Sequence, residues 1–233
     1  MKNALKIDKN ILPYNKKIIV EGDKSLSIRW VLLASQASGV SKAYNLLMSD
    51  DVLAAIESIK KLGINVKIYK SYCAIYGNGI NGFKYKKKTI IDARNSGTLG
   101  RLILGLLIKS PQKIKLIGDK SLSKRDFSRV TAPLKEFGVK FYYKKNNKLP
   151  ISILGSQSVR GIKYLENKGS AQCKSSVMFA AINASGTTSI KAKKSRNHSE
   201  LLFRYLKIPI KIKKTKKYDF IDIKQPKKIK PFN

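Results

Sequence analysis

Three apolar stretches of the chain show the spacing of hydrophobic and polar positions that is typical of buried helices. Each opens on small polar residues, which cap helices, and closes at a glycine or a proline, which ends them. The three stretches are Ser25–Gly39, Asn95–Pro111 and Gly169–Gly186. We therefore predict three helices with polar first turns and buried bodies.

A short strand, a second helix and two further strands are predicted after each of these helices. The short strands are predicted at Lys42–Leu47, Lys113–Gly118 and Thr187–Ala192. The second helices are predicted at Ser49–Gly63, Lys124–Gly138 and Ser195–Lys207. Alternating apolar positions then indicate strand pairs at 64–70 and 72–77, at 139–145 and 149–155, and at 208–214 and 218–224.

The same order of elements thus occurs three times, which indicates an internal repeat of roughly 70 residues. The units span about 21–80, 81–155 and 156–228, and each has a βαβαββ-like order. Gly63 and Gly138 stand where a glycine ends a helix, whereas the third unit has Pro209 nearby instead. Three units that pack around buried helices predict one α/β domain.

Composition narrows the class of protein. The formal net charge is +35, and lysine supplies most of it. This charge fits either a nucleic-acid-binding surface or a lysine-rich solvated surface around an anionic substrate. The lysines are scattered along the chain without zinc-finger spacing or an RNP-type aromatic motif. We therefore favour the second interpretation and expect no nucleic-acid partner.

Cysteine, histidine and hydropathy argue against metals, disulfides and membranes. Cys73 and Cys173 lie far apart without a CxxC partner, and His198 is the only histidine. Neither a zinc site nor a disulfide framework is therefore indicated. No stretch approaches the ~18 apolar residues of a membrane span, and residues 1–10 lack the apolar region of a signal peptide. We expect a cytoplasmic protein without a membrane partner.

The first turns of the three buried helices carry basic and small polar residues where acidic residues would suit the helix dipole. A helix N-terminus offers free N–H groups and a positive partial charge, so such residues there predict a phosphate or carboxylate site. The residues in question are Lys24, Ser25, Arg29, Asn95, Ser96, Gly97, Thr98, Ser170 and Gln172. Ordinary helix capping is the alternative for any one of these turns.

Arginine is concentrated near these turns in a protein that otherwise uses lysine. The planar guanidinium of arginine binds a carboxylate or a phosphate through two parallel hydrogen bonds. The residues are Arg29, Arg101, Arg125 and Arg196. Arg101 lies one turn inside its helix, where a purely structural role is the alternative. If the three units are arranged in a threefold-like manner, all of these groups face one shared region.

Five motifs, in this order, resemble the successive motifs of the EPSP synthase (3-phosphoshikimate 1-carboxyvinyltransferase) family. They are GDKSLSIR (22–29), RNSGTLGRL (94–102), GDKSLSKR (118–125), KGSAQCKS (168–175) and SRNHSE (195–200). The resemblance runs from about residue 11 to the end of the chain. The sister family, UDP-N-acetylglucosamine enolpyruvyl transferase, shares the fold, but the SAQ-x-KS and GDKS-x-S-x-R patterns favour the shikimate branch.

The resemblance implies a fold and a reaction. The fold would be one domain of the enolpyruvyl transferase inside-out α/β barrel. The reaction would transfer the enolpyruvyl group of phosphoenolpyruvate to the 5-hydroxyl of shikimate 3-phosphate, on the route to chorismate and aromatic amino acids. The family uses no metal or organic cofactor, and the full enzyme is expected to be a monomer.

The resemblance also implies ligand roles for named residues. Those matched to shikimate 3-phosphate are Lys24, Ser25, Arg29, Ser170, Ala171, Gln172, Ser195 and Arg196. Those matched to phosphoenolpyruvate are Lys24, Asn95, Gly97, Arg125 and Gln172. Lys24 and Gln172 would thus contact both substrates.

Four positions depart from the family pattern. Glu21 replaces a proline, Ile28 a polar residue, Asp126 the proline after Arg125, and Asn197 the aspartate of SRDH. None of these removes a matched ligand. Asp126 has the largest expected consequence, because a carboxylate beside Arg125 would compete with substrate for the guanidinium.

The family enzyme is about twice as long as this chain and has two similar domains. We therefore expect this chain to correspond to the N-terminal half and to need the other half for activity. The acid and base of the reaction belong to that other half, so no catalytic residue is predicted here. Residues 1–20, including a strand predicted at 11–20, would belong to the other domain, and residues 229–233 would form a truncated crossover.

Overall fold

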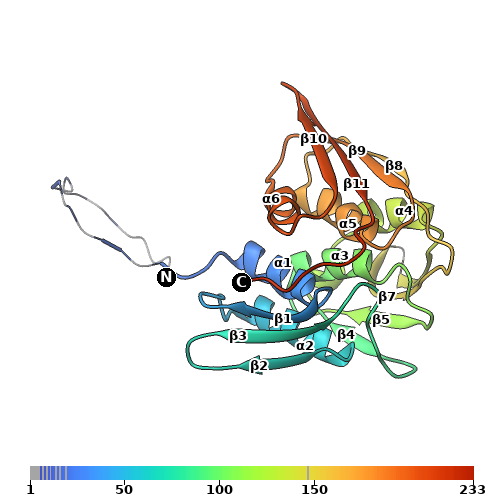
Figure 1. The fold of residues 1–233 in the computed structure, drawn as a ribbon, viewed down its shortest axis with the longest axis horizontal. Coiled ribbons are helices and arrows are strands. Elements are labelled where there is room, and N and C mark those ends of the chain that lie inside the picture. Colours follow the sequence, from blue (N-terminus) through green and yellow to red (C-terminus); the bar gives the residue numbers. More distant parts are fainter. Residues whose placement is uncertain are drawn as a thin grey trace.

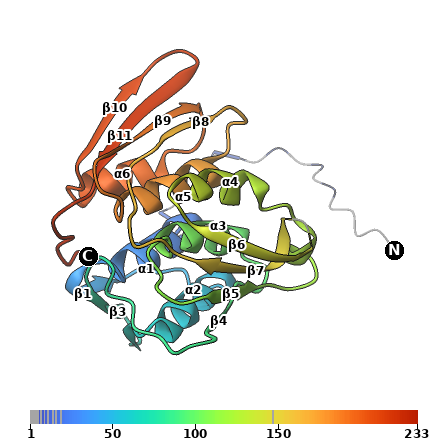
Figure 2. The same cartoon turned by 90° about the vertical axis from the view of Figure 1, so that its right-hand side faces the viewer.

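The computed structural model describes residues 6, 8, 10, 12, 13, 15, 17, 18, 20–145 and 147–233. Of the strand predicted at 11–20, residues 12, 13, 15, 17, 18 and 20 are described and none of them lies in a strand, so the prediction is wrong for these residues. Residues 11, 14, 16 and 19 lie outside the described residues. From residue 21 onward, helices occupy the middle of the molecule and three sheets lie around them (Figure 1; Figure 2). This is the α/β architecture that the sequence predicts.

The three sheets share one strand order, except that among the described residues the first lacks the strand that begins the other two. The first contains β1 (Ser38–Ala43), β3 (Cys73–Asn78) and β2 (Asn65–Ile68), in that order. The second has the order β4 (Ile90–Asp92), β5 (Ile114–Ile117), β7 (Lys148–Leu154), β6 (Lys140–Lys145). The third has the order β8 (Lys163–Glu166), β9 (Thr187–Lys193), β11 (Tyr218–Lys224), β10 (Ile210–Lys214). In the second and third sheets the first two strands are parallel and the remaining pairs are antiparallel.

The helices fall into two kinds. Buried residues surround most of α1 (Lys24–Ala34), α3 (Gly97–Leu106) and α5 (Ala171–Ala181), as expected for helices that are enclosed on all sides. Amphipathic helices cover them: α2 (Asp50–Lys61), α4 (Ser128–Glu136) and α6 (His198–Tyr205). A short 3-10 helix, η1 (Leu122–Lys124), precedes α4. The helix-strand-helix-strand-strand order of the sequence analysis is therefore present three times, while the unit boundaries stay an interpretation.

The C-terminal segment completes the first sheet. Ile229 forms a parallel bridge with Ala37, and the Ile229 carbonyl accepts a hydrogen bond of 2.9 Å from the Ser38 amide. The Phe232 carbonyl accepts a further one of 3.1 Å from the Lys42 amide. This segment therefore lies beside β1 in the way that β4 lies beside β5. The residues predicted to form a crossover are thus packed on the domain.

One strand differs from its prediction. We predicted a strand at Lys42–Leu47, whereas β1 spans Ser38–Ala43. The actual segment, SGVSKA, is too polar to show a strand pattern by itself. It is held by β3 on one side and by the C-terminal segment on the other, where Ser41 is buried and its Oγ accepts from the Phe232 amide at 3.2 Å. Long-range pairing here decides the structure.

The ends of α2, α4 and α6 share a left-handed residue. Gly63 (φ 84°) and Gly138 (φ 87°) follow α2 and α4, which confirms their prediction as helix-ending glycines. Lys207 follows α6 at φ 54°, in the position that glycine takes in the other two units. The third helix therefore ends with the same geometry without the residue that favours it.

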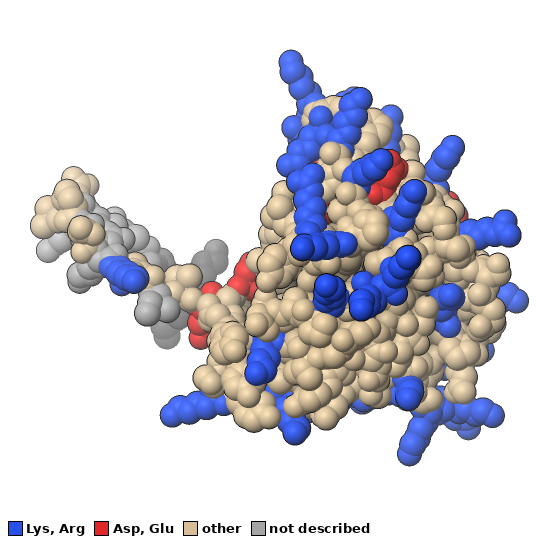
Figure 3. Space-filling view, viewed as in Figure 1, with Lys and Arg blue, Asp and Glu red and all other residues tan. Residues whose placement is uncertain are grey.

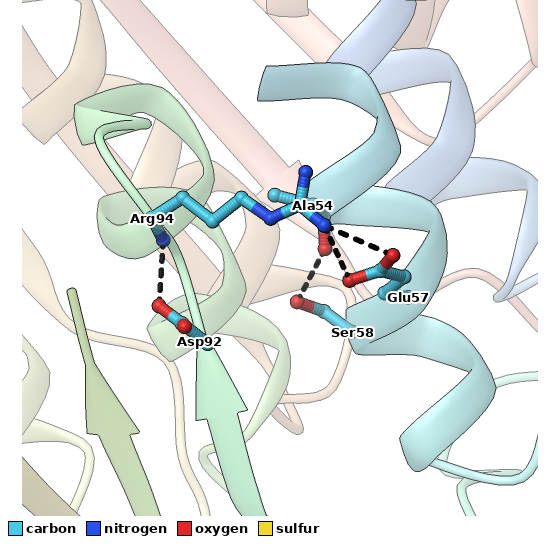
Figure 4. A network of polar contacts seen from close by, with 5 residues as sticks. All are labelled: Ala54, Glu57, Ser58, Asp92 and Arg94. Atoms are coloured by element: carbon cyan, nitrogen blue, oxygen red, sulfur yellow. Dashed lines mark hydrogen bonds and ion pairs between the residues drawn. The ribbon is translucent and has the colours of Figure 1, made fainter. Parts of the chain in front are cut away.

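Polar contacts join neighbouring units and also join helices within one unit. The Arg94 Nη2 atom lies 3.0 Å from both carboxylate oxygens of Glu57, and the Arg94 amide donates to Asp92 at 2.8 Å (Figure 4). This pair connects α2 of the first unit to the loop after β4 of the second. In the third unit, fully buried Lys174 on α5 forms an ion pair with buried Glu200 on α6.

The surface carries lysine and arginine around the whole visible face, with few acidic residues between them (Figure 3). The described helices include none long and apolar enough to cross a membrane. Within the described residues, no group of three His, Cys, Asp or Glu side chains could hold a metal ion.

Candidate functional site

The N-termini of α1, α3 and α5 converge on one end of the molecule. Each has a side-chain cap: Asp23 accepts from the Leu26 amide at 2.7 Å, Ser96 from Leu99 at 3.3 Å and Ser170 from Cys173 at 3.3 Å. None of the three has an acidic residue in its first turn. The helix dipoles therefore add to the positive potential of this end.

The first cavity, of about 330 Å³, lies between α1, α5 and the start of α6. Its lining combines two arginines with hydroxyl, amide and imidazole groups: Ser25, Arg29, Thr98, Gly169, Ser170, Ala171, Gln172, Ser195, Arg196 and His198. No carboxylate is among these lining residues, so the cavity suits an anion. Except for Lys24, every residue that the sequence analysis matched to shikimate 3-phosphate lines it.

The second cavity, of about 560 Å³, adjoins the first and shares Thr98 and Gln172 with it. It is lined by Lys24, Ser49, Asp50, Asp51, Asn95, Gly97, Thr98, Arg125 and Gln172. All five residues matched to phosphoenolpyruvate are in this group. Gln172 lies between the two cavities, where the sequence analysis expected a residue that contacts both substrates.

Arg29 is held in the wall of the first cavity by three protein groups. Its side chain is only 3% exposed, its Nε donates to Ser199 Oγ at 2.8 Å and its Nη2 to Ser175 Oγ at 3.1 Å. Its Nη1 donates to the Ser25 carbonyl at 2.9 Å. Burial lowers the pKa of Arg29 to about 10, so the guanidinium stays charged at neutral pH. Hydroxyls from α5 and α6 thus orient a fixed cation.

Gln172 is oriented by two residues of α3. Its Oε1 accepts a hydrogen bond of 2.7 Å from Arg101 Nη1, and its Nε2 donates to Thr98 Oγ1 at 2.9 Å. Arg101 also donates to the Gly97 carbonyl at 3.2 Å. Arg101 therefore positions Gln172 and lines neither cavity. This is the structural role given above as the alternative for Arg101.

The cations of the second cavity have protein partners. Lys24 Nζ lies 2.7 Å from Asp51 Oδ2, and Arg125 Nη2 donates to Asn95 Oδ1 at 3.3 Å. Asp126 does not take the guanidinium of Arg125. Instead its carboxylate accepts from the Ser128 amide at 2.6 Å and from the Ser128 hydroxyl at 2.8 Å. These hydrogen bonds hold the pKa of Asp126 below its usual value. The expected competition for Arg125 is absent from the described contacts.

Five lining residues were not named as site residues in the sequence analysis. Gly169 and His198 line the first cavity, and Ser49, Asp50 and Asp51 line the second. In the sequence, Asp50 and Asp51 have the pattern of an ordinary acidic first helical turn, and in the structure they do form the first turn of α2. For His198, a signal was present in its place within SRNHSE, at the start of a predicted helix.

Fold and site together define an α/β protein with two adjoining polar cavities at the N-terminal ends of its central helices. A family profile described as EPSP synthase (3-phosphoshikimate 1-carboxyvinyltransferase) matches residues 9–231. The chain belongs to the EPSP synthase family. This gives no support to the sister family or to a nucleic-acid-binding module.

Individual relatives agree with this assignment. The 3-phosphoshikimate 1-carboxyvinyltransferase of Caldicellulosiruptor bescii is 40% identical over 199 residues, which cover 84% of this chain and 46% of that protein. The protein of the same name from Streptococcus mutans is 37% identical over 198 residues. A solved structure of EPSP synthase from Acinetobacter baumannii matches with a TM-score of 0.85 at 30% identity, covering 96% of this chain and 51% of that one. The chain spans about half the length of these relatives.

Proposed function

We propose that this chain supplies the substrate-holding half of an EPSP synthase, with shikimate 3-phosphate in the first cavity and phosphoenolpyruvate in the second. The observation that carries this proposal is the division of the two predicted ligand sets between two adjoining cavities, with Gln172 common to both. Residues from motifs that lie far apart in the chain thus form two neighbouring sets, one for each proposed substrate.

In this proposal, the first cavity holds the phosphate of shikimate 3-phosphate. Arg29 and Arg196 provide positive charge, and the hydroxyls of Ser25, Ser170 and Ser195 provide hydrogen bonds. Fixed cations and hydroxyls bind a phosphate dianion without reorganising, which favours affinity. No carboxylate of the described residues lines this cavity, so no side chain of the lining repels the phosphate.

The second cavity holds phosphoenolpyruvate beside the bound shikimate ring. Lys24 and Arg125 face the substrate's phosphate and carboxylate, and Gly97 allows close approach to the backbone. Gln172, fixed by Arg101 and Thr98, separates the two ligands and sets the approach of the hydroxyl to the enolpyruvyl carbon. Proton delivery and removal are assigned to the other half of the enzyme, so this chain alone is proposed to bind but not to react.

Calorimetry with shikimate 3-phosphate tests the proposal. We expect binding at micromolar to millimolar concentration, weakened at least tenfold by Arg196→Gln. Arg125→Gln is the matched control, because it removes one exposed guanidinium from the second cavity and should leave this affinity within twofold. The absence of binding at millimolar concentration, or equal effects of the two variants, would overturn the assignment of the cavities.

A further inference from the structure

His198 is a titratable side chain in the first cavity to which the proposed function gives no role. It is the first residue of α6 and lines the cavity beside Ser195 and Arg196. Its Nδ1 and the Ser195 Oγ are both buried, and neither has a hydrogen-bond partner among the described residues. A buried polar atom without a partner costs about 1–3 kcal/mol, so two of them in one cavity wall call for an explanation.

Charged groups of α1, of the loop before α6 and of α6 itself act on the imidazole. Arg29 of α1 and Arg196 of the preceding loop are positive, whereas Asp23 at the start of α1 and Glu200 of α6 are negative. Glu200 is itself paired with Lys174 of α5. Burial, then Arg29 and Arg196, lower the pKa of His198 below its ordinary value, against the opposing effect of Asp23 and Glu200. The neutral form of the ring is therefore favoured in the free protein.

We propose that His198 is a further anion-binding group of the first cavity, which takes up a proton when a phosphate monoester binds and then donates a hydrogen bond to a phosphate oxygen. This inference deepens the proposed function and rests on it for the identity of the monoester. The proton comes from solvent, and no covalent bond to the ligand forms.

The sign of the coupling follows from the charges in the cavity. In the free protein the two arginines disfavour a third positive charge. A phosphate dianion between them reverses the local potential and favours the imidazolium, so the pKa of His198 rises on binding. By linkage, affinity for the dianion increases as pH falls from about 8 through the raised pKa of the complex, and levels off below the pKa of the free protein.

The sole histidine makes this directly measurable. The ring signals of His198 can be followed by NMR against pH in the full chain, without added histidines and without an assignment problem. We expect a pKa below 6.5 in sodium chloride, and a rise of about one unit or more in saturating shikimate 3-phosphate or inorganic phosphate at the same ionic strength. Arg160→Gln, which removes an exposed arginine that lines neither cavity, should leave this rise intact.

The outcomes separate the two proposals. A pKa that stays in place or falls at saturating phosphate, with saturation read from backbone signals, overturns the role of His198. If inorganic phosphate raises the pKa while shikimate 3-phosphate does not bind, the proposed function fails and the role of His198 stands. If neither anion binds, both fail. His198→Gln should reduce the affinity for phosphate three- to tenfold at pH 6.5 and should flatten its dependence on pH.

Discussion

Gly97 is the residue at which the second cavity depends most on the absence of a side chain. A Cβ atom there would lie 2.7 Å from Arg101 Nη1 and 3.1 Å from Arg125 Nη1. Both guanidiniums would have to move, although one orients Gln172 and the other faces the proposed phosphoenolpyruvate. Gly100, one turn further along α3, has only ordinary contacts at 3.5 Å.

We expect Gly97→Ala to weaken phosphoenolpyruvate binding about tenfold or more, because it displaces Arg125. Gly100→Ala is the control and should leave binding unchanged while stabilising the helix by up to about 1 kcal/mol. The measurement is a phosphoenolpyruvate titration in the presence of shikimate 3-phosphate. Equal affinities for both variants would show that Gly97 does not limit the cavity.

Lys207 gives a second prediction at this scale. A left-handed residue other than glycine costs roughly 1–2 kcal/mol, so Lys207→Gly should raise the free energy of unfolding by about 0.5–1 kcal/mol after the entropy cost of glycine. Gly138→Ala, at the corresponding helix end, should lower it by about 1 kcal/mol. Urea denaturation measures both, and a destabilising Lys207→Gly would contradict the argument.

The conformation of a single residue could be predicted from the sequence where its residue type has one dominant structural role. Gly63 and Gly138 were predicted correctly because helix ends favour glycine. Lys207 could not be predicted, because nothing in a lysine signals a left-handed conformation. Asp51 was missed because an acidic residue in a first helical turn already has a sufficient local reason, and its pairing with Lys24 depends on tertiary structure.

At the scale of elements, the contact between α5 and α6 determines the shape of the first cavity. Arg29, Ser175 and Ser199 join α1, α5 and α6 through hydrogen bonds of 2.7–3.1 Å. The adjacent residues of the two helices, Lys174 and Glu200, form an ion pair in which Lys174 is fully buried. The cavity wall therefore rests on charges that must stay paired.

Replacing Glu200 by leucine should lower the free energy of unfolding by about 3–5 kcal/mol, because Lys174 would be left buried without its partner. The double variant Lys174→Met/Glu200→Leu should recover most of this loss, since no charge of the pair remains buried. Chemical denaturation of the single and double variants provides the comparison. A double variant as unstable as the sum of the two single variants would mean that the pair is held for another reason.

Element prediction was accurate where local pattern and tertiary environment agree. The strands with clear alternation, such as β7 and β11, lie close to their predicted positions. β1 was displaced by several residues, because its polar sequence becomes a strand only between β3 and the C-terminal segment. The three central helices were predicted from their apolar bodies and polar starts, and residues of these polar starts line the two cavities.

At the scale of the whole molecule, the two ends of the described domain are joined. The C-terminal segment pairs with β1, and Phe232 packs edge-on against Trp30 with ring centroids 6.0 Å apart. Trp30 belongs to α1, whose first turn lines both cavities. The C-terminal segment therefore packs against the helix that carries Lys24, Ser25 and Arg29.

Phe232→Ala should lower the free energy of unfolding by about 1–2 kcal/mol, less than for a fully buried phenylalanine because Phe232 is only partly buried. Trp30 is the only tryptophan, so its fluorescence reports the change directly. Phe220→Ala, on an exposed strand position, serves as control and should change stability by less than about 0.5 kcal/mol. Similar losses for both would rule out a specific role for the C-terminal contact.

The proposed function requires one cavity for each substrate. A crystal structure of the chain grown with shikimate 3-phosphate would show which cavity holds its phosphate. We predict its phosphate in the first cavity, within about 3.2 Å of the guanidinium of Arg196 and the hydroxyl of Ser170, with the ring toward Gln172. A phosphate bound beside Arg125 and Lys24 instead, or only among surface lysines with the first cavity unaltered, would contradict the account.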